Sequence, residues 1–321
     1  MDLCLIIPTK NKPKNLKRLL IFYTKINFLG QIIIIDSSDD NYLRKNSAEI
    51  KKTNKLNISH LNIKGSYFEV IAKAHSIIEK NYYVCCGDDD FFNLEVANKG
   101  IKFLDNNKDF ISYTGNALLL LILSNKNFKL DMYKTRSFLQ QSAKDRLINL
   151  LKNYCVTNFY ITRTIYLKKI NVGVYKERSK DHELNERLNS ILNVIYGKIY
   201  KINEILFVRT INNNRTPLPK NMNFFLDENH TILKFFLKKI SDSLVNVENL
   251  NNKEIETFIK KNEKILVLGY DKPSPYKNIK TKLNKNLTFF IYYKLKNVMK
   301  LKNSINYYLK IFKELVEKEK E

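Results

Sequence analysis

Short apolar runs alternate with amphipathic segments at the start of the chain. Residues 3–8 (LCLIIP) and 31–36 (QIIIID) are nearly continuous apolar runs, typical of strands that are buried on both faces. Between them, from Pro13 onward, leucine and tyrosine recur at helical spacing, so this segment predicts a helix with proline in its first turn. Two buried strands joined by one helix form a βαβ unit, which implies parallel pairing and a right-handed crossover.

The alternation continues through a third and a fourth strand. We expect a strand over residues 57–63, a helix over residues 67–79, and a strand that leads into Asp88. This order predicts an α/β fold with a doubly wound sheet, in which ligands bind beyond the carboxyl ends of the strands. Three polar segments follow such strand ends: residues 9–12, 36–39 and 88–90. We therefore expect them to meet at one edge of the sheet and to form the site.

The later part of the chain predicts further strands and helices. The expected elements are strands over residues 110–114 and 118–123, a helix over residues 136–152, a helix from Asp181 to Gly197, and a strand over residues 202–209. The first two of these strands could form a hairpin through Gly115-Asn116. From residue 216 the composition changes to Lys-rich helical segments with paired aromatics. We therefore divide the chain into a sheet domain, residues 1–215, and a helical C-terminal appendage, residues 216–321.

The acidic triplet Asp88-Asp89-Asp90 directly follows an apolar strand and Gly87. On extended backbone, Asp88 and Asp90 project to one side and Asp89 to the other. Two carboxylates at a strand end suit Mg²⁺ or Mn²⁺, which keep positions for water and substrate phosphates. The alternative is an acidic turn that caps a helix beginning at Asn93. We favour a metal site at Asp88 and Asp90, because three adjacent anions need solvation or a cation.

These segments resemble the nucleotide-sugar-dependent glycosyltransferases of the GT-A fold, in particular the family 2-like group of bacteria. The resemblance covers roughly residues 1–215 and is carried by IIPTKNKPKNLKRLL from Ile6, IIIIDSSDD from Ile32, GDDDFF from Gly87 and KDHELNERL from Lys180. It implies a Rossmann-like GT-A domain with a mixed, mainly parallel sheet flanked by helices. It also implies transfer of a sugar from a nucleotide-sugar donor to a hydroxyl of a glycan or lipid-linked acceptor, in the synthesis of surface polysaccharide.

The resemblance also implies roles for individual residues. By this resemblance the nucleotide-sugar contacts are Thr9, Asn11, Asp36, Lys73 and Asp89, and the metal ligands are Asp88 and Asp90. Thr9 and Asn11 would hold the base and ribose, and Asp36 would contact one of them. Lys73, on the helix before the triplet, would approach the diphosphate. Ser37 stands where many family members carry a second acid.

The resemblance further implies a general base near the start of a later helix, where Asp181 and Glu183 lie. An acceptor hydroxyl ionises far above neutral pH, so it needs a carboxylate within hydrogen-bond reach to take its proton. We expect Asp181 first, because Glu183 lies beside the apolar stripe, although Asp181 is also suited to cap that helix. One base opposite the leaving group is the layout of an inverting mechanism. The chain has no tryptophan, whereas processive family members carry a Trp-containing motif, which favours transfer of single sugars.

The formal net charge of +24 suggests a polyanionic partner or phosphorylated substrates, although coding bias toward lysine explains part of it. Residues 276–313 contain ten lysines and no acidic residue, interleaved with aromatics. This combination suits a helix on an anionic membrane surface, or equally a helix that packs its aromatics on the core. No secretory signal or membrane-spanning run is evident, so we expect a cytoplasmic protein, peripheral on the inner face of the membrane if residues 276–313 bind lipid.

Two other classes of function are compatible with some of these features. A non-catalytic module that binds a nucleotide or carbohydrate would share the fold and the polar segments at one edge of the sheet. A metal-dependent nucleotidyltransferase acting on nucleic acid would also use paired aspartates and positive charge. The chain is short for the several domains of a template-dependent polymerase, and its βαβ unit precedes the acidic triplet. Nucleic acid is therefore the less favoured partner.

Overall fold

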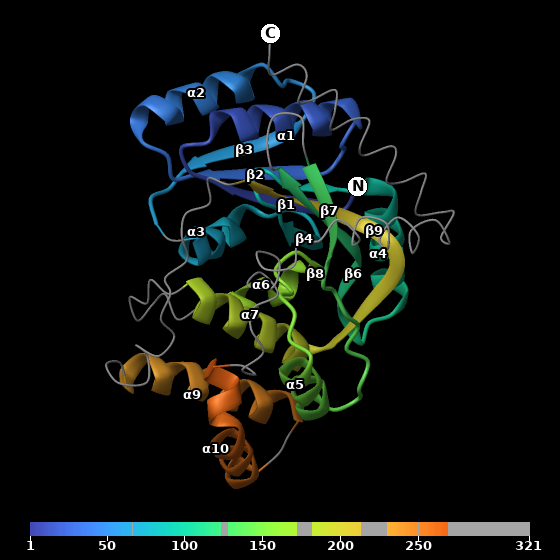
Figure 1. Ribbon diagram of the computed structural model, residues 1–321, viewed down its shortest axis with the longest axis vertical. Helices are drawn as coiled ribbons and strands as arrows, with labels where there is room; N and C mark the ends of the chain where they lie inside the picture. The colour runs from blue at the N-terminus through green and yellow to red at the C-terminus, as the bar shows by residue number, and fades with distance from the viewer. Residues whose placement is uncertain (66, 123–127, 172–181, 213–229, 249–250, 269–321) are drawn as a thin grey trace.

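The computed structural model describes residues 1–65, 67–122, 128–171, 182–212, 230–248 and 251–268. Strands and helices alternate along much of this chain, and the strands form one mixed sheet with helices packed against both of its faces (Figure 1). The α/β class predicted from the apolar runs is therefore confirmed.

The first four strands form the parallel part of the sheet. In chain order the elements are β1 (Leu3–Thr9), α1 (Pro13–Lys25), β2 (Gln31–Asp36), α2 (Asp40–Lys51), β3 (Asn57–Asn62), α3 (Tyr67–Ala74), the 3₁₀ helix η1 (His75–Ile77) and β4 (Tyr82–Cys85). β1 pairs in parallel with both β2 and β4, and β2 pairs in parallel with β3. The predicted elements of this part are confirmed, and α2 is an additional helix that the apolar pattern did not reveal. The register sets Thr9 beside Asp36, so two of the predicted polar segments meet at one edge.

Alternating side chains along β1 attach helices to both faces of the sheet. Leu5 and Ile7 are fully buried in the cluster that contains the apolar stripe of α1. Ile6 points to the opposite face and is buried with Ile71 of α3. Because successive side chains of a strand point to opposite faces, a strand covered on both faces needs a continuous apolar run. This is why residues 3–8 contain no charged side chain.

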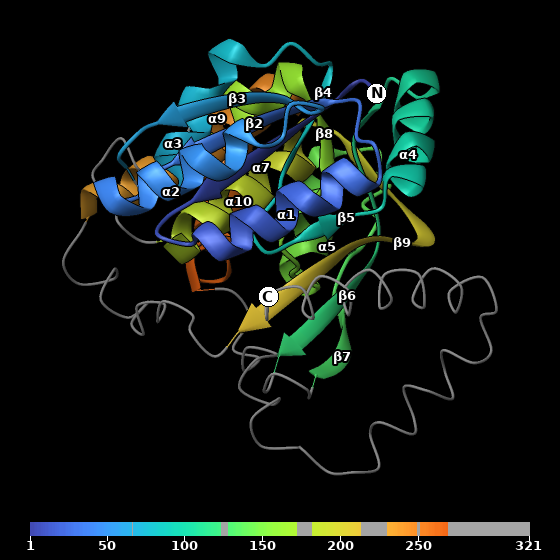
Figure 2. The ribbon, with the colours of Figure 1, turned by 90° about the horizontal axis from the view of Figure 1, so that it is seen from above.

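The second half of the sheet is mixed. Its elements are β5 (Phe91–Phe92), α4 (Leu94–Asn106), β6 (Phe110–Ile122), β7 (Phe128–Tyr133), α5 (Ala143–Lys152), β8 (Ile161–Arg163), η2 (Thr164–Tyr166), α6 (Leu167–Ile170), α7 (His182–Tyr196) and β9 (Lys198–Asn212). The strand order is β3-β2-β1-β4-β8-β6-β9-β5, with β7 paired to β6. β6 and β9 run in parallel, and with β7 they extend beyond the helices that cover the rest of the sheet (Figure 2).

The predicted hairpin through Gly115-Asn116 is wrong, because residues 110–122 form one strand. β6 passes Gly115 without turning, and the irregularity is absorbed by shifts of its register with β9. Gly115 lies against the partner strand so closely that a Cβ there would be 2.5 Å from the carbonyl oxygen of Glu204. The glycine thus serves a close approach between strands, which in sequence has the same signature as a turn.

The helix predicted from residue 136 begins later, at Ala143. Phe138 exchanges two backbone hydrogen bonds of 2.9 Å with Ile199, which holds the preceding segment against β9. Ser142 then caps the helix, since its Oγ accepts from the N–H of Asp145 (3.0 Å). Tertiary pairing therefore overrides helical spacing in the first residues of the predicted segment.

Helix α9 (His230–Glu248) packs against α5 and α7, and α10 (Asn252–Leu268) packs against α9 at the end of the molecule away from α2 (Figure 1). Phe236 and Ile240 of α9 share one buried cluster with Leu188 of α7. The expected boundary between residues 215 and 216, and the basic segment 276–313, lie outside the described residues. None of the helices in the described part of the chain combines the length and the apolar character that a membrane span requires.

Candidate functional site

The acidic triplet lies in a turn at the end of β4. The N–H of Asp90 donates to the carbonyl of Gly87 (3.1 Å), which closes a four-residue turn. Extended backbone does not continue through the triplet, so the expected alternation of its side chains does not describe it. Asp88 contacts the start of the chain, whereas Asp90 contacts β9.

Asp88 is held by the segment that joins β1 to α1. Thr9 Oγ1 donates to Asp88 Oδ2 (2.7 Å), and Asn15 Nδ2 donates to Oδ1 (3.3 Å). The Nζ of Lys12 lies 3.9 Å from the same Oδ1. Burial and the neighbouring charge of Asp89 raise the pKa of Asp88 to about 6, against the opposing effect of these three partners. The structure thus brings Thr9 and Asp88 together, as the strand-end argument predicted.

Asp90 is held by the last strand of the sheet. Its Oδ1 accepts from the N–H of Thr210 (3.2 Å), and Thr210 Oγ1 donates to the carbonyl of Asp89 (2.6 Å). Burial and the charge of Asp89 raise the pKa of Asp90 to about 7, and the charge of Arg209 acts in the opposite direction. Two carboxyls of one turn therefore both ionise less readily than usual.

Gly87 leaves space beside two of these carboxylates. A Cβ at this position would lie 2.8 Å from Asp90 Oδ2 and 3.1 Å from Asp89 Oδ1. Both oxygens therefore face the same small volume, which any side chain at position 87 would fill. An alanine there would push directly on the acidic turn.

The chemistry of the turn fits a divalent cation. Asp88 and Asp90 are buried, and a nearby cation would relieve the repulsion that raises their pKa values. Within the described ranges, no cluster of three or more Cys, His, Asp and Glu side chains forms a metal site by itself. Mg²⁺ does not require one, because it is commonly bound by one or two carboxylates together with water and substrate phosphates. Metal binding by Asp88 and Asp90 stays a prediction.

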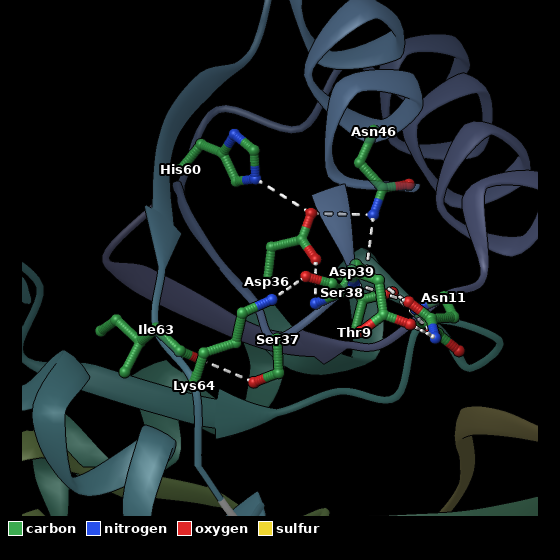
Figure 3. A network of polar contacts seen from close by, with 11 residues as sticks. Thr9, Asn11, Asp36, Ser37, Ser38, Asp39, Asn46, His60, Ile63 and Lys64 are labelled. Carbon is green, nitrogen blue, oxygen red and sulfur yellow. Dashed lines mark hydrogen bonds and ion pairs between the residues drawn. The ribbon is translucent and has the colours of Figure 1, made fainter. Parts of the chain in front are cut away.

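Asp36, at the end of β2, is fully buried and surrounded by hydrogen-bond donors (Figure 3). Its Oδ1 accepts from the N–H of Ser38 (2.9 Å), and its Oδ2 accepts from Asn46 Nδ2 (2.8 Å). His60 Nε2 lies 3.2 Å from Oδ2. Burial alone would raise the pKa of Asp36, but the hydrogen bonds from these three residues outweigh it and lower the pKa to about 2. Both carboxylate oxygens are therefore engaged within the protein, and they anchor the loop that follows β2.

That loop is joined to the loop after β1 (Figure 3). Asn11 Nδ2 donates to Asp39 Oδ2 (2.8 Å), and the N–H of Asp39 donates to Asn11 Oδ1 (2.9 Å). The N–H of Asn11 also donates to Ser38 Oγ (2.7 Å). Asn11 has a φ of 57°, in the left-handed region that asparagine adopts more readily than most residues. Asn11 thus fixes the relative position of the two loops, and exposed Asp39 forms the outer rim of this edge.

Lys73 lies in the last turn of α3, where its Nζ is 3.9 Å from Glu69 Oε1 and half of its side chain is exposed. Among the described residues, no hydrogen bond or ion pair joins Lys73 to the acidic turn. The lysine that does reach the turn is Lys12. The structure therefore does not bring Lys73 together with the predicted metal ligands, and its approach to a diphosphate stays a prediction.

The two candidates for the general base are only partly placed. Asp181 lies outside the described residues, and Glu183 is in the first turn of α7 with its side chain outside them. Burial raises the pKa of Tyr67 on α3, and the charges of Glu186 and Asp90 both act on this hydroxyl in the same direction. The Tyr67 hydroxyl is therefore within electrostatic reach of both Glu186 and Asp90.

A pocket lined by amide side chains lies between α3, β4 and α7. Its lining includes Tyr67, Tyr83, Asn158, Asn171, Asn189 and Asn193. Asn189 Nδ2 donates to Asn171 Oδ1 (2.6 Å), and Asn171 Nδ2 donates to the Tyr83 hydroxyl (3.4 Å). Within the described part of the chain, the buried Oδ1 of Asn189 has no hydrogen-bond partner. The pocket can therefore accept a small uncharged donor such as water.

Two contributors to the acidic turn, Asn15 and Thr210, were not predicted from the sequence, and Lys12 lies in the predicted segment 9–12 but was given no contact of its own. Lys12 and Asn15 follow the end of β1, so their position along the chain was an available signal. Thr210 had no such signal, because it is 120 residues from Asp90 and only the pairing of β9 with β5 brings it there.

Comparison with solved structures shows a similar fold in Staphylococcus aureus TarS. One TarS structure superposes with a TM-score of 0.53 at 16% identity, covering 89% of this chain and 46% of that chain. TarS 1–349 in complex with UDP gives a TM-score of 0.52 at 17% identity, covering 89% of this chain and 76% of that chain. This chain thus spans less than half of the longer TarS structure. Neither a protein-family model nor a curated protein sequence matches the chain. The likeness shows the fold, which is GT-A-like, as the sequence predicted.

Proposed function

We propose that this protein is a glycosyltransferase that moves a single sugar from a nucleotide-sugar donor to a hydroxyl of a glycan or lipid-linked acceptor. The observation that carries the proposal is the acidic turn at the carboxyl edge of the parallel strands. Open α/β sheets bind their ligands at this edge. Asp88 and Asp90 concentrate buried negative charge there, which suits a metal-bound diphosphate.

The fold supports the same function. TarS is a glycosyltransferase, and one of its structures contains UDP. UDP is therefore the first nucleotide to test on this chain. The joined loops of Thr9, Asn11 and Asp39 would form the side of the site that receives the base and ribose. Asp36 would act indirectly, by holding the loop that carries Asp39.

The proposed reaction breaks the bond between the anomeric carbon of the sugar and a β-phosphate oxygen. The electron pair of that bond stays on the phosphate, while the acceptor oxygen forms the new bond from the opposite face of the sugar. The acceptor proton passes to a carboxylate, for which we propose Asp181 or Glu183. Mg²⁺ or Mn²⁺ held by Asp88 and Asp90 would supply positive charge beside the departing diphosphate. Attack from the opposite face inverts the anomeric configuration, which NMR of the product can check.

The first experiment measures the melting temperature with UDP, GDP, CMP and dTDP, each with and without Mn²⁺. A ligand that binds only the folded state stabilises it by about 2.7 kcal/mol at a hundredfold excess over its Kd. We expect one nucleotide to raise the melting temperature, and to require Mn²⁺ for this. Stabilisation without Mn²⁺ would contradict the metal site but would still be consistent with a glycosyltransferase. No response to any nucleotide would contradict the proposed function.

A further inference from the structure

Arg209 of β9 lies directly beside the acidic turn. β5 and β9 pair antiparallel, with Phe91 opposite Val208, so Arg209 follows the residue that pairs with the neighbour of Asp90. The following residue, Thr210, makes both hydrogen bonds from β9 to the turn. The backbone of Arg209 is therefore fixed relative to the triplet.

The guanidinium of Arg209 is also fixed, by two aromatic rings. Its Nη1 donates to the hydroxyl of Tyr133 on β7 (3.0 Å). Its central carbon lies 5.1 Å from the ring centre of Tyr133 and 4.5 Å from that of Phe159. These rings pack against each other and against Phe207, with centroid distances of 5.7 to 6.2 Å. A guanidinium held in this way loses little further freedom when it binds an anion.

Lys12 and Lys73 are held less firmly than Arg209. Lys12 reaches Asp88 only at 3.9 Å and is 48% exposed, and Lys73 is paired with Glu69 on the surface of its own helix. The charge of Arg209, in contrast, acts on both Asp90 and the Tyr67 hydroxyl, which stand on different elements. Arg209 thus supplies positive charge to the space between β5, α3 and β9.

We propose that Arg209 binds the β-phosphate of the nucleoside diphosphate, and that Tyr133 and Phe159 position it for this role. The inference rests on the proposed function and assigns one of its contacts. As the bond to the anomeric carbon breaks, its electron pair stays on the β-phosphate, and a guanidinium already in place stabilises that added charge without rearrangement. The contact of Lys73 with the diphosphate, which the family resemblance suggested, stays a separate prediction.

The test compares the nucleoside diphosphate that stabilises the wild type with its own monophosphate, by calorimetric titration in the presence of Mn²⁺. Arg209→Met should weaken binding of the diphosphate by about tenfold or more and leave the monophosphate within about twofold. Arg209→Lys, which keeps the charge but loses the planar fork, should lie between the wild type and Arg209→Met. Tyr133→Phe keeps the ring and removes the hydroxyl, so it should weaken the diphosphate alone, by about threefold. Arg44→Met, at an exposed arginine of α2, is the matched control and should bind both ligands like the wild type.

A purely structural arginine would give a different result. Arg209→Met would then lower the melting temperature and change the affinities for diphosphate and monophosphate equally, or not at all, which overturns the proposal. If Arg209→Met does not fold, the test uses Arg209→Lys and Tyr133→Phe. For each of them the ratio of the affinity for the diphosphate to that for the monophosphate is compared with the ratio of the wild type. A wild type that binds no nucleoside diphosphate overturns the proposed function together with this contact. If the wild type and the variants bind the nucleoside diphosphate equally well, only the role of Arg209 is overturned.

Discussion

Two buried aspartates at the same edge of the sheet are in opposite electrostatic states. Asp36, after β2, accepts hydrogen bonds from Ser38 and Asn46 and lies beside His60, and its pKa is lowered to about 2. Asp90, after β4, receives backbone hydrogen bonds from Thr210 and Gly87 and lies near the charge of Arg209, but burial and its acidic neighbour Asp89 outweigh these and raise its pKa to about 7. The residue type and the degree of burial are the same. What differs is the surroundings: Asp36 accepts side-chain hydrogen bonds from several donors, whereas Asp90 lies beside the charge of Asp89.

This difference separates an anchor from a binding group. A buried carboxylate whose charge is balanced by the protein holds local structure, and it gains nothing from an external cation. A buried carboxylate whose charge is not balanced destabilises the empty site and is stabilised by a cation or a cationic ligand. Burial alone does not distinguish the two cases, so the hydrogen-bond donors around each carboxylate have to be compared.

The largest expected effect is on turnover. Asp88→Asn and Asp90→Asn should each lower metal-dependent sugar transfer by about a hundredfold or more. Each removes a proposed ligand of the cation, and with it the positive charge that the cation would supply beside the developing anion. Circular dichroism and the melting temperature should show that both variants fold. Asp40→Asn, an exposed acid at the start of α2, is the matched control and should keep full activity. Full activity in both triplet variants would refute the metal site.

The next effect is on stability, and here Asp36 should be the sensitive residue. Asp36→Ala leaves the donors of Ser38, Asn46 and His60 buried without their acceptor, so it should lower the free energy of unfolding by about 3 kcal/mol. Urea unfolding measures this loss. Asp39→Ala removes an exposed carboxylate from the same loop and should change stability by less than about 1 kcal/mol. Equal losses in the two variants would show that the buried network is not the anchor of the loop.

The third effect is a dependence of stability on pH without metal. The folded-state pKa values of Asp88 and Asp90 are raised, so their stabilising contribution is complete below about pH 4 and is lost as the pH rises through 6 and 7. Asp90→Asn should therefore gain stability relative to the wild type at about pH 8, by at least about 1 kcal/mol, and this gain should shrink steadily toward about pH 4. Asp36 has the opposite sign, since its contribution is lost only as the pH falls from about 4 toward 2. A stability difference between wild type and Asp90→Asn that does not change from pH 5 to pH 8 would contradict the unbalanced charge.

Much of the fold could be predicted from the sequence, because the parallel strands are buried on both faces. Residues 3–8 and 31–36 have a pattern that suits few other structures, and the observed β1 and β2 match them closely. Prediction failed where tertiary contacts decided the outcome. Gly115 has the signature of a turn but serves a close contact between strands, and the predicted start of α5 is drawn into a pairing with β9.

The candidate site divides in the same way. Its location and its acidic residues follow from polar segments that come directly after apolar strands. The state of each acid does not, because its partners come from distant parts of the chain. His60 is 24 residues from Asp36, and Thr9 is 79 residues from Asp88. No local rule of sequence tells which aspartate will find such donors and which will remain with unbalanced charge.

The bonds from Thr210 to the acidic turn also have a consequence for folding on the ribosome. The turn itself is complete in sequence once residue 90 has been synthesised, and the parallel strands before it can already pair. Its last two hydrogen bonds, to Asp89 and Asp90, form only after a further 120 residues have emerged. Contacts of such long sequence separation form late and slowly. While these 120 residues are synthesised, the nascent chain therefore carries the parallel strands and an unfinished acidic turn, which can be completed only after Thr210 has emerged.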